Sequence, residues 1–238
     1  MKTFSVFDLP IHLSDDYEGW LCDRIYHNIG THVVTMNSEM AMMAQKNNDL
    51  KQYIQNADLV VPDGSGVVLY LRQRGQKQKR VAGIELAESL VKRLGQKGKE
   101  NPICFYGAAV GVTDKAAKKF QALIPDIYII NNHGFLQGDD LQAWCEKIKQ
   151  VQPKLILVGL GVPRQEEWIV NHRHLAPNAV WIGVGGSFDI WGGVKERAPK
   201  FFCDNNLEWL YRLYQEPWRW KRMMMLPRFF IKSLFYKG

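Results

Sequence analysis

One aspartate stands where a predicted buried strand gives way to a glycine turn. The run Leu59-Val60-Val61 is typical of a buried parallel strand, and it ends at Pro62-Asp63-Gly64-Ser65-Gly66. A helix-compatible run follows from Val67. This pattern places Asp63 at the carboxyl end of the strand, where open α/β sheets bind their ligands. We interpret Asp63 as the chemical centre of the protein. The alternative is an aspartate that only caps the following helix.

Glycine-rich turns follow other predicted strands, most clearly at 159–161 and 183–186. Backbone N–H groups in such turns can bind an anion, which suits a nucleotide or a nucleotide-sugar ligand. The dinucleotide fingerprint is incomplete, because Arg164 and Phe188 occupy the place of its third glycine. Neither a P-loop nor a Gly-x-Ser-x-Gly elbow occurs. An NAD enzyme and a serine hydrolase are therefore both disfavoured.

The residue types that usually bind metals are scattered along the chain. The sequence contains no Asp-x-Asp pattern, and His172 and His174 are two apart, so they would point in different directions on a helix. The four cysteines lie far from one another, which indicates a reduced compartment without a zinc site. The sequence therefore predicts neither a metal site nor a cofactor.

Six short apolar runs, each followed by a turn and a helix-compatible segment, predict the scaffold for these residues. The runs cover 32–35, 59–61, 103–106, 127–130, 155–158 and 179–182. Their repeated strand–turn–helix order predicts an α/β fold with a Rossmann-like, doubly wound, mostly parallel sheet. An edge strand at 4–7 is also expected. The basic stretch 72–80 is expected to be a solvated loop, although Arg80, close to Gly83, could face a phosphate or a sugar.

The last part of the chain differs from the rest in composition. Residues 195–238 contain ten Lys or Arg and four Asp or Glu, so they carry six of the seven net positive charges. We therefore predict an α/β catalytic domain at 1–194 and a basic, aromatic-rich helical appendage at 195–238. With so little net charge on the main domain, nucleic acid is not an expected partner.

Basic and aromatic residues alternate in the second half of the appendage. Trp218, Arg219, Trp220 and Arg222 are followed by more rings and cations, a pattern typical of segments that bind a membrane surface. The alternative is packing on the main domain or against another subunit, which we favour for the apolar stripe at 207–214. No apolar run approaches the roughly 18 residues that a membrane-spanning helix needs, and the first residues lack a signal core.

Taken together, these motifs resemble the WecG/TagA/CpsF family of bacterial glycosyltransferases, and the resemblance spans the chain from about residue 31 onward. The segments that carry it are 35–40, 57–64, 80–83, 161–166, 183–189, 197–200 and 207–213. The resemblance implies a metal-independent, inverting transfer of a sugar from a UDP donor to a polyprenyl-diphosphate-linked sugar. It also implies a peripheral location on the cytoplasmic face of the membrane.

The resemblance assigns roles to individual residues. It implies that Asp63 is the general base toward the acceptor hydroxyl. The residues expected to bind the donor or to line its pocket are Thr35, Asn37, Arg80, Gly83, Gln165, Gly185 and Gly186, with Phe135 and Asp189 at the uridine end. Arg212, Arg219 and Arg222 would hold the acceptor diphosphate, and Trp218 and Trp220 would contact the membrane.

Members of this family use several hexoses, and we favour UDP-N-acetylmannosamine as the donor and undecaprenyl-diphosphate-linked N-acetylglucosamine as the acceptor. Transfer of glucose or a uronic acid is the first alternative. A peripheral membrane scaffold that has lost catalysis is the second. The product would belong to teichoic acid or another cell-surface polysaccharide. A homo-oligomer is compatible with the sequence.

Overall fold

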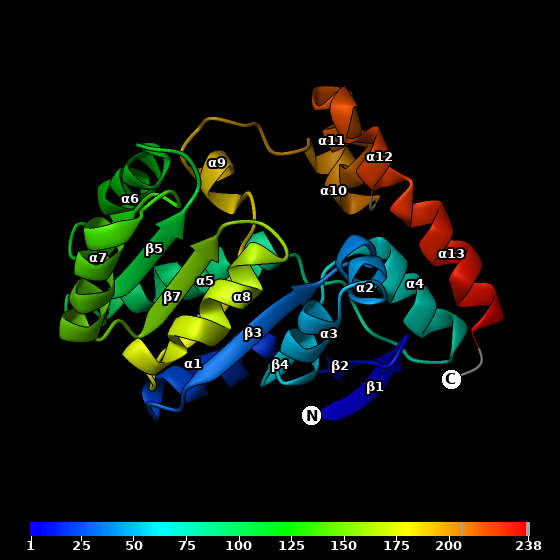
Figure 1. Cartoon of the computed structure of the whole chain (residues 1–238), viewed down its shortest axis with the longest axis horizontal. Helices are drawn as coiled ribbons and strands as arrows, with labels where there is room; N and C mark the ends of the chain where they lie inside the picture. Colours follow the sequence, from blue (N-terminus) through cyan, green and yellow to red (C-terminus); the bar gives the residue numbers. More distant parts are fainter. Residues whose placement is uncertain (206, 237–238) are drawn as a thin grey trace.

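The computed structural model describes residues 1–205 and 207–236, apart from the side chain of Arg219. Its centre is a six-stranded parallel sheet with strand order β4-β3-β8-β7-β5-β6 (Figure 1). The strands are β3 (Thr31–Met36), β4 (Leu59–Pro62), β5 (Ile103–Gly107), β6 (Ile129–Asn132), β7 (Leu155–Gly159) and β8 (Val180–Gly183). The predicted α/β fold with a parallel sheet is confirmed, and each apolar run corresponds to one of these strands.

Helices cover both faces of the sheet. One face carries α1 (Tyr17–Tyr26), α5 (Gly83–Gln96), α6 (Val112–Leu123) and α9 (Ser187–Trp191). The other carries α2 (Ser38–Ala44), α3 (Asn48–Gln55), α7 (Gly138–Val151), α8 (Arg164–His172) and the 3-10 turn η1 (Arg173–Leu175). The strands are apolar on both sides because both faces are covered: along β5, Phe105 packs into one core and Tyr106 into the other.

The parallel arrangement brings three turns from distant parts of the chain to one edge of the sheet. Asn37 follows β3, Asp63 follows β4 and Gly185 follows β8, and these strands are neighbours in the order β4-β3-β8. The Asp63 N–H donates to the Met36 carbonyl oxygen at 2.9 Å, so the ladder between β3 and β4 continues into the turn. The fold therefore positions Asp63 through the backbone.

The N-terminus forms an antiparallel hairpin of β1 (Lys2–Val6) and β2 (Leu9–Leu13). We predicted one edge strand at 4–7, which was wrong at Phe7 and missed the second strand. Phe7 and Asp8 form the turn, and both have positive φ. Such turns favour Asn or Gly, and neither is present to signal the turn. His12 in β2 accepts a hydrogen bond through Nδ1 from the Val60 N–H, which ties the hairpin to β4.

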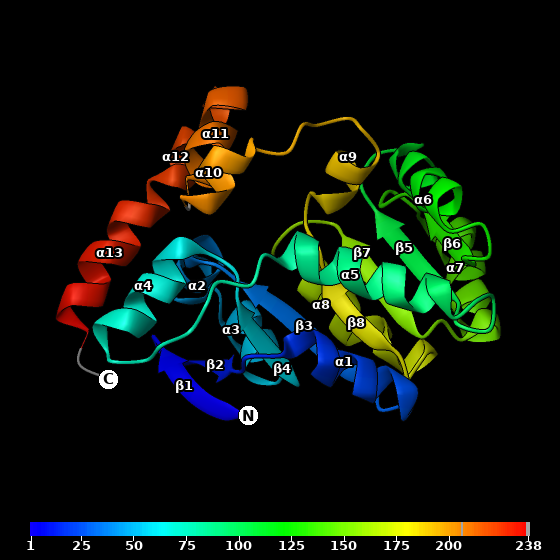
Figure 2. The ribbon, with the colours of Figure 1, turned by 180° about the vertical axis from the view of Figure 1, so that it is seen from behind.

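The C-terminal segment crosses the carboxyl edge of the sheet and returns along its side (Figures 1 and 2). It consists of α10 (Lys200–Asp204), α11 (Glu208–Gln215), η2 (Pro217–Arg219), α12 (Trp220–Met223) and α13 (Met225–Phe235). Helix α13 runs beside α2 and α4 (Ser65–Gln73), and its Phe229 is buried against Phe7. Arg74 donates to the carbonyl oxygens of Ser233 and Tyr236, so α13 is fixed at its end.

Two observations bear on the expectations about this segment. The stripe at 207–214 was expected to pack on the main domain or against another subunit; in the structure, α11 has no fully buried residue and Tyr214 is 82% exposed. Conversely, Phe229 falls in the part predicted to face a membrane, and it is buried in the core. Among the described residues, no helix has the length and hydropathy needed to cross a bilayer.

Candidate active site

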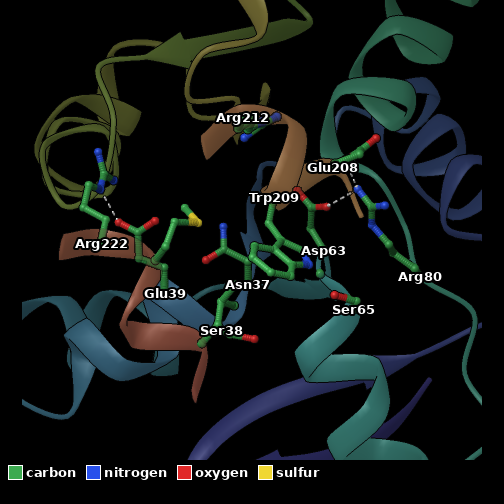
Figure 3. Close-up of a pocket in the computed structure, with 13 residues that line it drawn as sticks. Asn37, Ser38, Glu39, Asp63, Ser65, Arg80, Glu208, Trp209, Arg212 and Arg222 are labelled. Carbon is green, nitrogen blue, oxygen red and sulfur yellow. Dashed lines mark hydrogen bonds and ion pairs between the residues drawn. The ribbon is translucent and has the colours of Figure 1, made fainter. Parts of the chain in front are cut away.

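A pocket opens at the carboxyl end of β4, between the sheet and helices α11 to α13 (Figure 3). It encloses about 740 Å³ of space, a figure that includes its open mouth. The main domain contributes Asn37, Ser38, Glu39, Asp63, Gly64, Ser65 and Arg80, and the C-terminal segment contributes Glu208, Trp209, Arg212, Arg222, Met223 and Leu226. The pocket is therefore built by both parts of the chain.

The Asp63 carboxyl lies inside this pocket with its side chain 23% exposed. Burial raises the pKa of Asp63 to about 6, although the charge of Arg80 and a hydrogen bond from the Gly83 N–H act in the opposite direction. Gly83 begins α5, and a Cβ there would lie 3.1 Å from Asp63 Oδ2, so only glycine lets the helix start this close. The N-cap of α4 is Gly64. The Asp63 carboxylate therefore accepts a hydrogen bond from the first N–H of α5. The capping alternative concerned a different helix, α4, which follows Asp63 in the sequence.

Arg80 lies beside Asp63 but forms its shorter ion pair with a residue of α11. Its Nη2 is 2.5 Å from Glu208 Oε2 and 3.7 Å from Asp63 Oδ1. Burial alone would raise the pKa of Glu208, but hydrogen bonds from Cys203 and Arg80 and the charge of Arg80 lower it. Arg80 is the residue of the basic stretch that was expected to be able to face a ligand, and it lies in the pocket, where Glu208 of α11 pairs with it.

The floor of the site is a chain of polar contacts between β3, β8 and α8. The Thr35 hydroxyl donates to the Gly183 carbonyl oxygen at 3.1 Å. The Gly185 N–H donates to Gln165 Oε1 at 3.0 Å, and Gln165 Nε2 donates to Glu166 Oε1 at 3.1 Å. A smaller cavity adjoins this floor. Its lining includes Thr35, Gln165 and Gly185, together with Asp63, Gly83, Gly186 and Arg212. The predicted glycine turn is therefore held by Gln165, which uses the Gly185 N–H.

Glu166, which this floor includes, is fully buried, and its Oε2 has no hydrogen-bond partner among the described residues. Burial raises its pKa to about 7. The folded protein therefore binds a proton at the Glu166 carboxyl more tightly than the unfolded chain does, since the pKa of this group in the unfolded chain is 4.5. The contribution of Glu166 to the free energy of unfolding therefore falls as the pH rises from about 4.5 to about 7, and it stays low above that range.

Glu166→Gln is expected to stabilise the protein at pH 8, by at most about 3 kcal/mol, and to have little effect at pH 5. The amide keeps the volume and the contact with Gln165 without carrying a charge. Urea unfolding of both proteins at the two pH values measures the difference. Glu167→Gln, a change on the exposed side of the same helix turn, is the matched control and should show no pH-dependent gain. Equal effects at pH 5 and pH 8 would contradict the assignment.

Three further predicted residues line the pocket. The Asn37 side chain caps α2 by accepting a hydrogen bond from the Met40 N–H at 2.9 Å, and it also lines the pocket. Arg222 Nε is 2.5 Å from Glu39 Oε1. Arg212 also lines the pocket, and its charge lowers the pKa of Asp63. Figure 3 shows the Arg80 and Arg222 ion pairs on opposite sides of the pocket.

Other predicted residues lie farther away. Phe135 is 62% exposed and follows β6, at the opposite edge of the sheet from β4. Asp189 in α9 is 3.1 Å from Lys195 Nζ, which also lies 3.0 Å from Glu216 Oε1. Trp218 and Trp220 are exposed. The side chain of Arg219 lies outside the described part of the chain.

Several pocket residues were not singled out from the sequence, and three of them are Glu39, Glu208 and Trp209. Each lies in a segment that carried the family resemblance, which was the available signal. Their roles depend on partners far along the chain, since 128 residues separate Arg80 from Glu208 and 183 separate Glu39 from Arg222. In the described part of the chain, no three His, Cys, Asp or Glu side chains are grouped as metal ligands.

Comparison with known proteins shows the family of the chain. A sequence model of the glycosyl transferase WecG/TagA/CpsF family matches residues 4–238. A Bacillus subtilis protein named N-acetylglucosaminyldiphosphoundecaprenol N-acetyl-beta-D-mannosaminyltransferase is 38% identical over 212 residues, which cover 88% of this chain and 81% of the relative. Proteins of the same name from Bacillus spizizenii and Staphylococcus aureus are 38% and 33% identical; they cover 92% and 84% of this chain, and 88% and 78% of their own lengths. The chain therefore belongs to the WecG/TagA/CpsF family and is a glycosyltransferase.

Proposed function

We propose that the protein transfers N-acetylmannosamine from UDP to the N-acetylglucosamine of an undecaprenyl-diphosphate acceptor. One observation carries the proposal: a single pocket joins a carboxyl group of raised pKa, at Asp63, to the guanidinium groups of Arg80, Arg212 and Arg222. A base and several cations are what a sugar transfer between two diphosphates requires. The names of the relatives supply the sugar and the acceptor.

The proposed reaction is a single displacement. The Asp63 carboxylate takes the proton of the acceptor hydroxyl while that oxygen forms a bond to the anomeric carbon. The bond between this carbon and the UDP oxygen breaks, and UDP leaves with the electron pair. Attack from the face opposite UDP inverts the anomeric centre. The pKa of about 6 leaves Asp63 ionised at neutral pH, and so ready to accept the proton.

The charge that develops on UDP needs compensation. We assign this role to Arg80 and to the Gly186 N–H in the turn after β8, since the Gly185 N–H is already donated to Gln165. A third cavity extends from that turn to Arg212 and Arg222, so these two side chains border both this cavity and the Asp63 pocket. We place the acceptor diphosphate on these two arginines, because one guanidinium group can donate two parallel hydrogen bonds to the oxygens of a phosphate. Phe135 and Asp189 remain the proposed contacts of the uridine end.

We also propose that the enzyme is peripheral on the inner face of the cytoplasmic membrane, where a lipid-linked acceptor would be available. Trp218 and Trp220 are 72% and 56% exposed on the C-terminal segment, and Phe235 is exposed at the end of α13. Lysine and arginine residues accompany these rings. Exposed rings and cations together favour binding at the surface of an anionic bilayer.

UDP release from a panel of UDP-sugars, with a short-chain prenyl-diphosphate N-acetylglucosamine acceptor, tests the proposal. We expect the highest kcat/KM with UDP-N-acetylmannosamine, compared with UDP-glucose, UDP-N-acetylglucosamine and a UDP-uronic acid. NMR of the product should show an inverted anomeric centre. Addition of EDTA should leave the rate unchanged.

Each part of the proposal has its own contrary result. Preference for another UDP-sugar would reject the donor. Retention of configuration would reject the single displacement, and a loss of rate in EDTA that Mg²⁺ restores would reject metal independence. Absence of UDP release with every donor would reject the activity itself.

A further inference from the structure

An apolar groove leaves the Asp63 pocket on the side of helix α13. Its walls include Leu69 and Tyr70 of α4 and Phe229 and Phe230 of α13. These helices lie side by side in both views (Figures 1 and 2). We call this feature the Leu69 groove. It is distinct from the cavity at Gln165, since the two share no lining residue.

The Leu69 groove is continuous with the pocket. Four side chains line both spaces: Ser38, Ser65, Trp209 and Leu226. Figure 3 shows Trp209, Ser38 and Ser65 along one side of the pocket. A ligand could therefore extend from Asp63 into the groove past the Trp209 ring.

The chemical character changes along this path. The pocket end contains Asp63 and borders Arg212 and Arg222, whereas the far end is formed by aromatic and aliphatic side chains. This sequence of a reactive carboxylate, cations and then apolar walls matches a molecule with a sugar, a diphosphate and a hydrocarbon chain. A water-soluble substrate would not use the apolar end.

Two details at the junction favour an occupied groove. Ser38 is 2% exposed, and its Oγ has no hydrogen-bond partner among the described residues. A buried hydroxyl without a partner costs stability unless a ligand supplies one, and here only the diphosphate of the acceptor could do so, because isoprene units carry no hydrogen-bond acceptor. Gly66 is next to it, and a Cβ there would lie 2.2 Å from Ser38 Oγ and 3.6 Å from Phe229 Cδ1. Any side chain at position 66 would crowd the junction.

We propose that the Leu69 groove binds the isoprene units next to the diphosphate of the lipid acceptor, an inference that rests on the proposed function. The groove ends beside Phe230, which is 45% exposed, and the neighbouring Ile231 is 56% exposed. The remaining chain would leave the protein there, on the side of α13 proposed to face the bilayer. The groove thus gives the lipid a direct path from membrane to catalytic base.

The test compares the binding of farnesyl diphosphate with that of inorganic pyrophosphate, without membranes, by isothermal titration calorimetry. Both probes carry a diphosphate, but only the first carries isoprene units. We expect farnesyl diphosphate to bind at least about tenfold more tightly, because each methylene group removed from water contributes to affinity. Equal affinities of the two probes would overturn the proposal. Competition in which pyrophosphate displaces farnesyl diphosphate at equal concentration would overturn it as well.

Neighbouring residues of α13 provide matched variants. Phe230→Gln alters the groove, whereas Ile231→Gln removes a similarly exposed apolar side chain that does not line it. Phe230→Gln should remove most of the preference for farnesyl diphosphate and leave pyrophosphate binding unchanged. Leu69→Gln, on the opposite wall, should do the same. An equal loss in Ile231→Gln would indicate a general effect of surface hydrophobicity and reject the groove.

Sugar transfer distinguishes this inference from the proposed function. Suppose that sugar is transferred with equal kcat/KM to short and long prenyl acceptors and that the two probes bind equally well. This result would reject the groove as a prenyl site, but it would support the proposed transferase activity. Preferential binding of farnesyl diphosphate without transfer of any sugar would reject the proposed activity and support a groove for prenyl chains. The two results are separate because the binding test needs neither donor nor chemistry.

Discussion

Asp63→Asn is expected to lower kcat for sugar transfer by about 10²- to 10⁴-fold, the usual contribution of a general base. Asparagine keeps the size of the side chain and can still accept the Gly83 hydrogen bond, but it cannot take the acceptor proton. Donor binding should change little, since Arg80 keeps its ion pair with Glu208. The measurement is kcat at saturating donor and acceptor. A variant that kept more than about a tenth of the wild-type kcat would contradict the assignment.

The same variant is expected to be at least as stable as the wild type. Burial raises the pKa of Asp63 from 3.8 to about 6, so the folded protein holds this proton more tightly than the unfolded chain. The contribution of Asp63 to the free energy of unfolding therefore falls as the pH rises from about 4 to about 6. At pH 7, removing the charge should stabilise the fold by at most about 3 kcal/mol. Loss of activity together with a higher Tm would separate a catalytic role from a structural one.

The control for this variant lies at the other end of the same strand. Asp58 precedes β4, and its carboxylate accepts from the His32 N–H and pairs with Arg173. Asp58→Asn removes a charge of the same sign from the end of β4 that is remote from the pocket. It should leave kcat unchanged. The wild-type rate should also fall as the pH drops through about 6, because the base must be unprotonated, and Asp58→Asn should retain this profile.

The scaffold was largely predictable from the sequence because its physical signals are local. Short β-branched runs bounded by glycine turns identified the six strands, and the turn after Val61 identified Asp63. The order of strands could not be predicted, since it depends on which pairs of helices cover each face. The N-terminal hairpin was missed because Phe7 takes a positive φ in the turn, which is uncommon for a bulky aromatic residue.

The part of the site that the sequence did not reveal depends on contacts over long distances. A basic stretch usually forms a solvated loop, and nothing near Arg80 in the sequence indicates that Glu208 will neutralise it. Phe229 and Phe230 illustrate the same difficulty on one helix. They are adjacent and identical, yet the first is buried and the second is 45% exposed. Only the position of α13 on α2 and α4 determines which ring faces the core.

Replacing the exposed rings of the C-terminal segment is expected to weaken binding to anionic vesicles by at least about tenfold. The variant Trp218→Ser, Trp220→Ser, Phe235→Ser removes three exposed side chains, and apolar area inserted at the interface contributes to affinity in proportion to its size. Substitution tests the membrane surface better than truncation after Tyr214. Truncation would also remove Phe229 from the core and Arg222 from the pocket.

Two assays distinguish a membrane surface from a general loss of function. With a soluble short-chain acceptor, kcat should stay within about twofold of the wild type, because the rings lie outside the pocket lining. With a long-chain acceptor in vesicles, the rate should fall in parallel with sedimentation of the protein with vesicles.

Tyr26→Ser, which removes a 73% exposed ring from α1 on the main domain, is the matched control and should bind vesicles normally. Since cations of this segment add an electrostatic attraction, higher salt should weaken binding of the wild type as well. Wild-type affinity of the triple variant for vesicles would reject the segment as the membrane contact and leave the assignment of Asp63 intact.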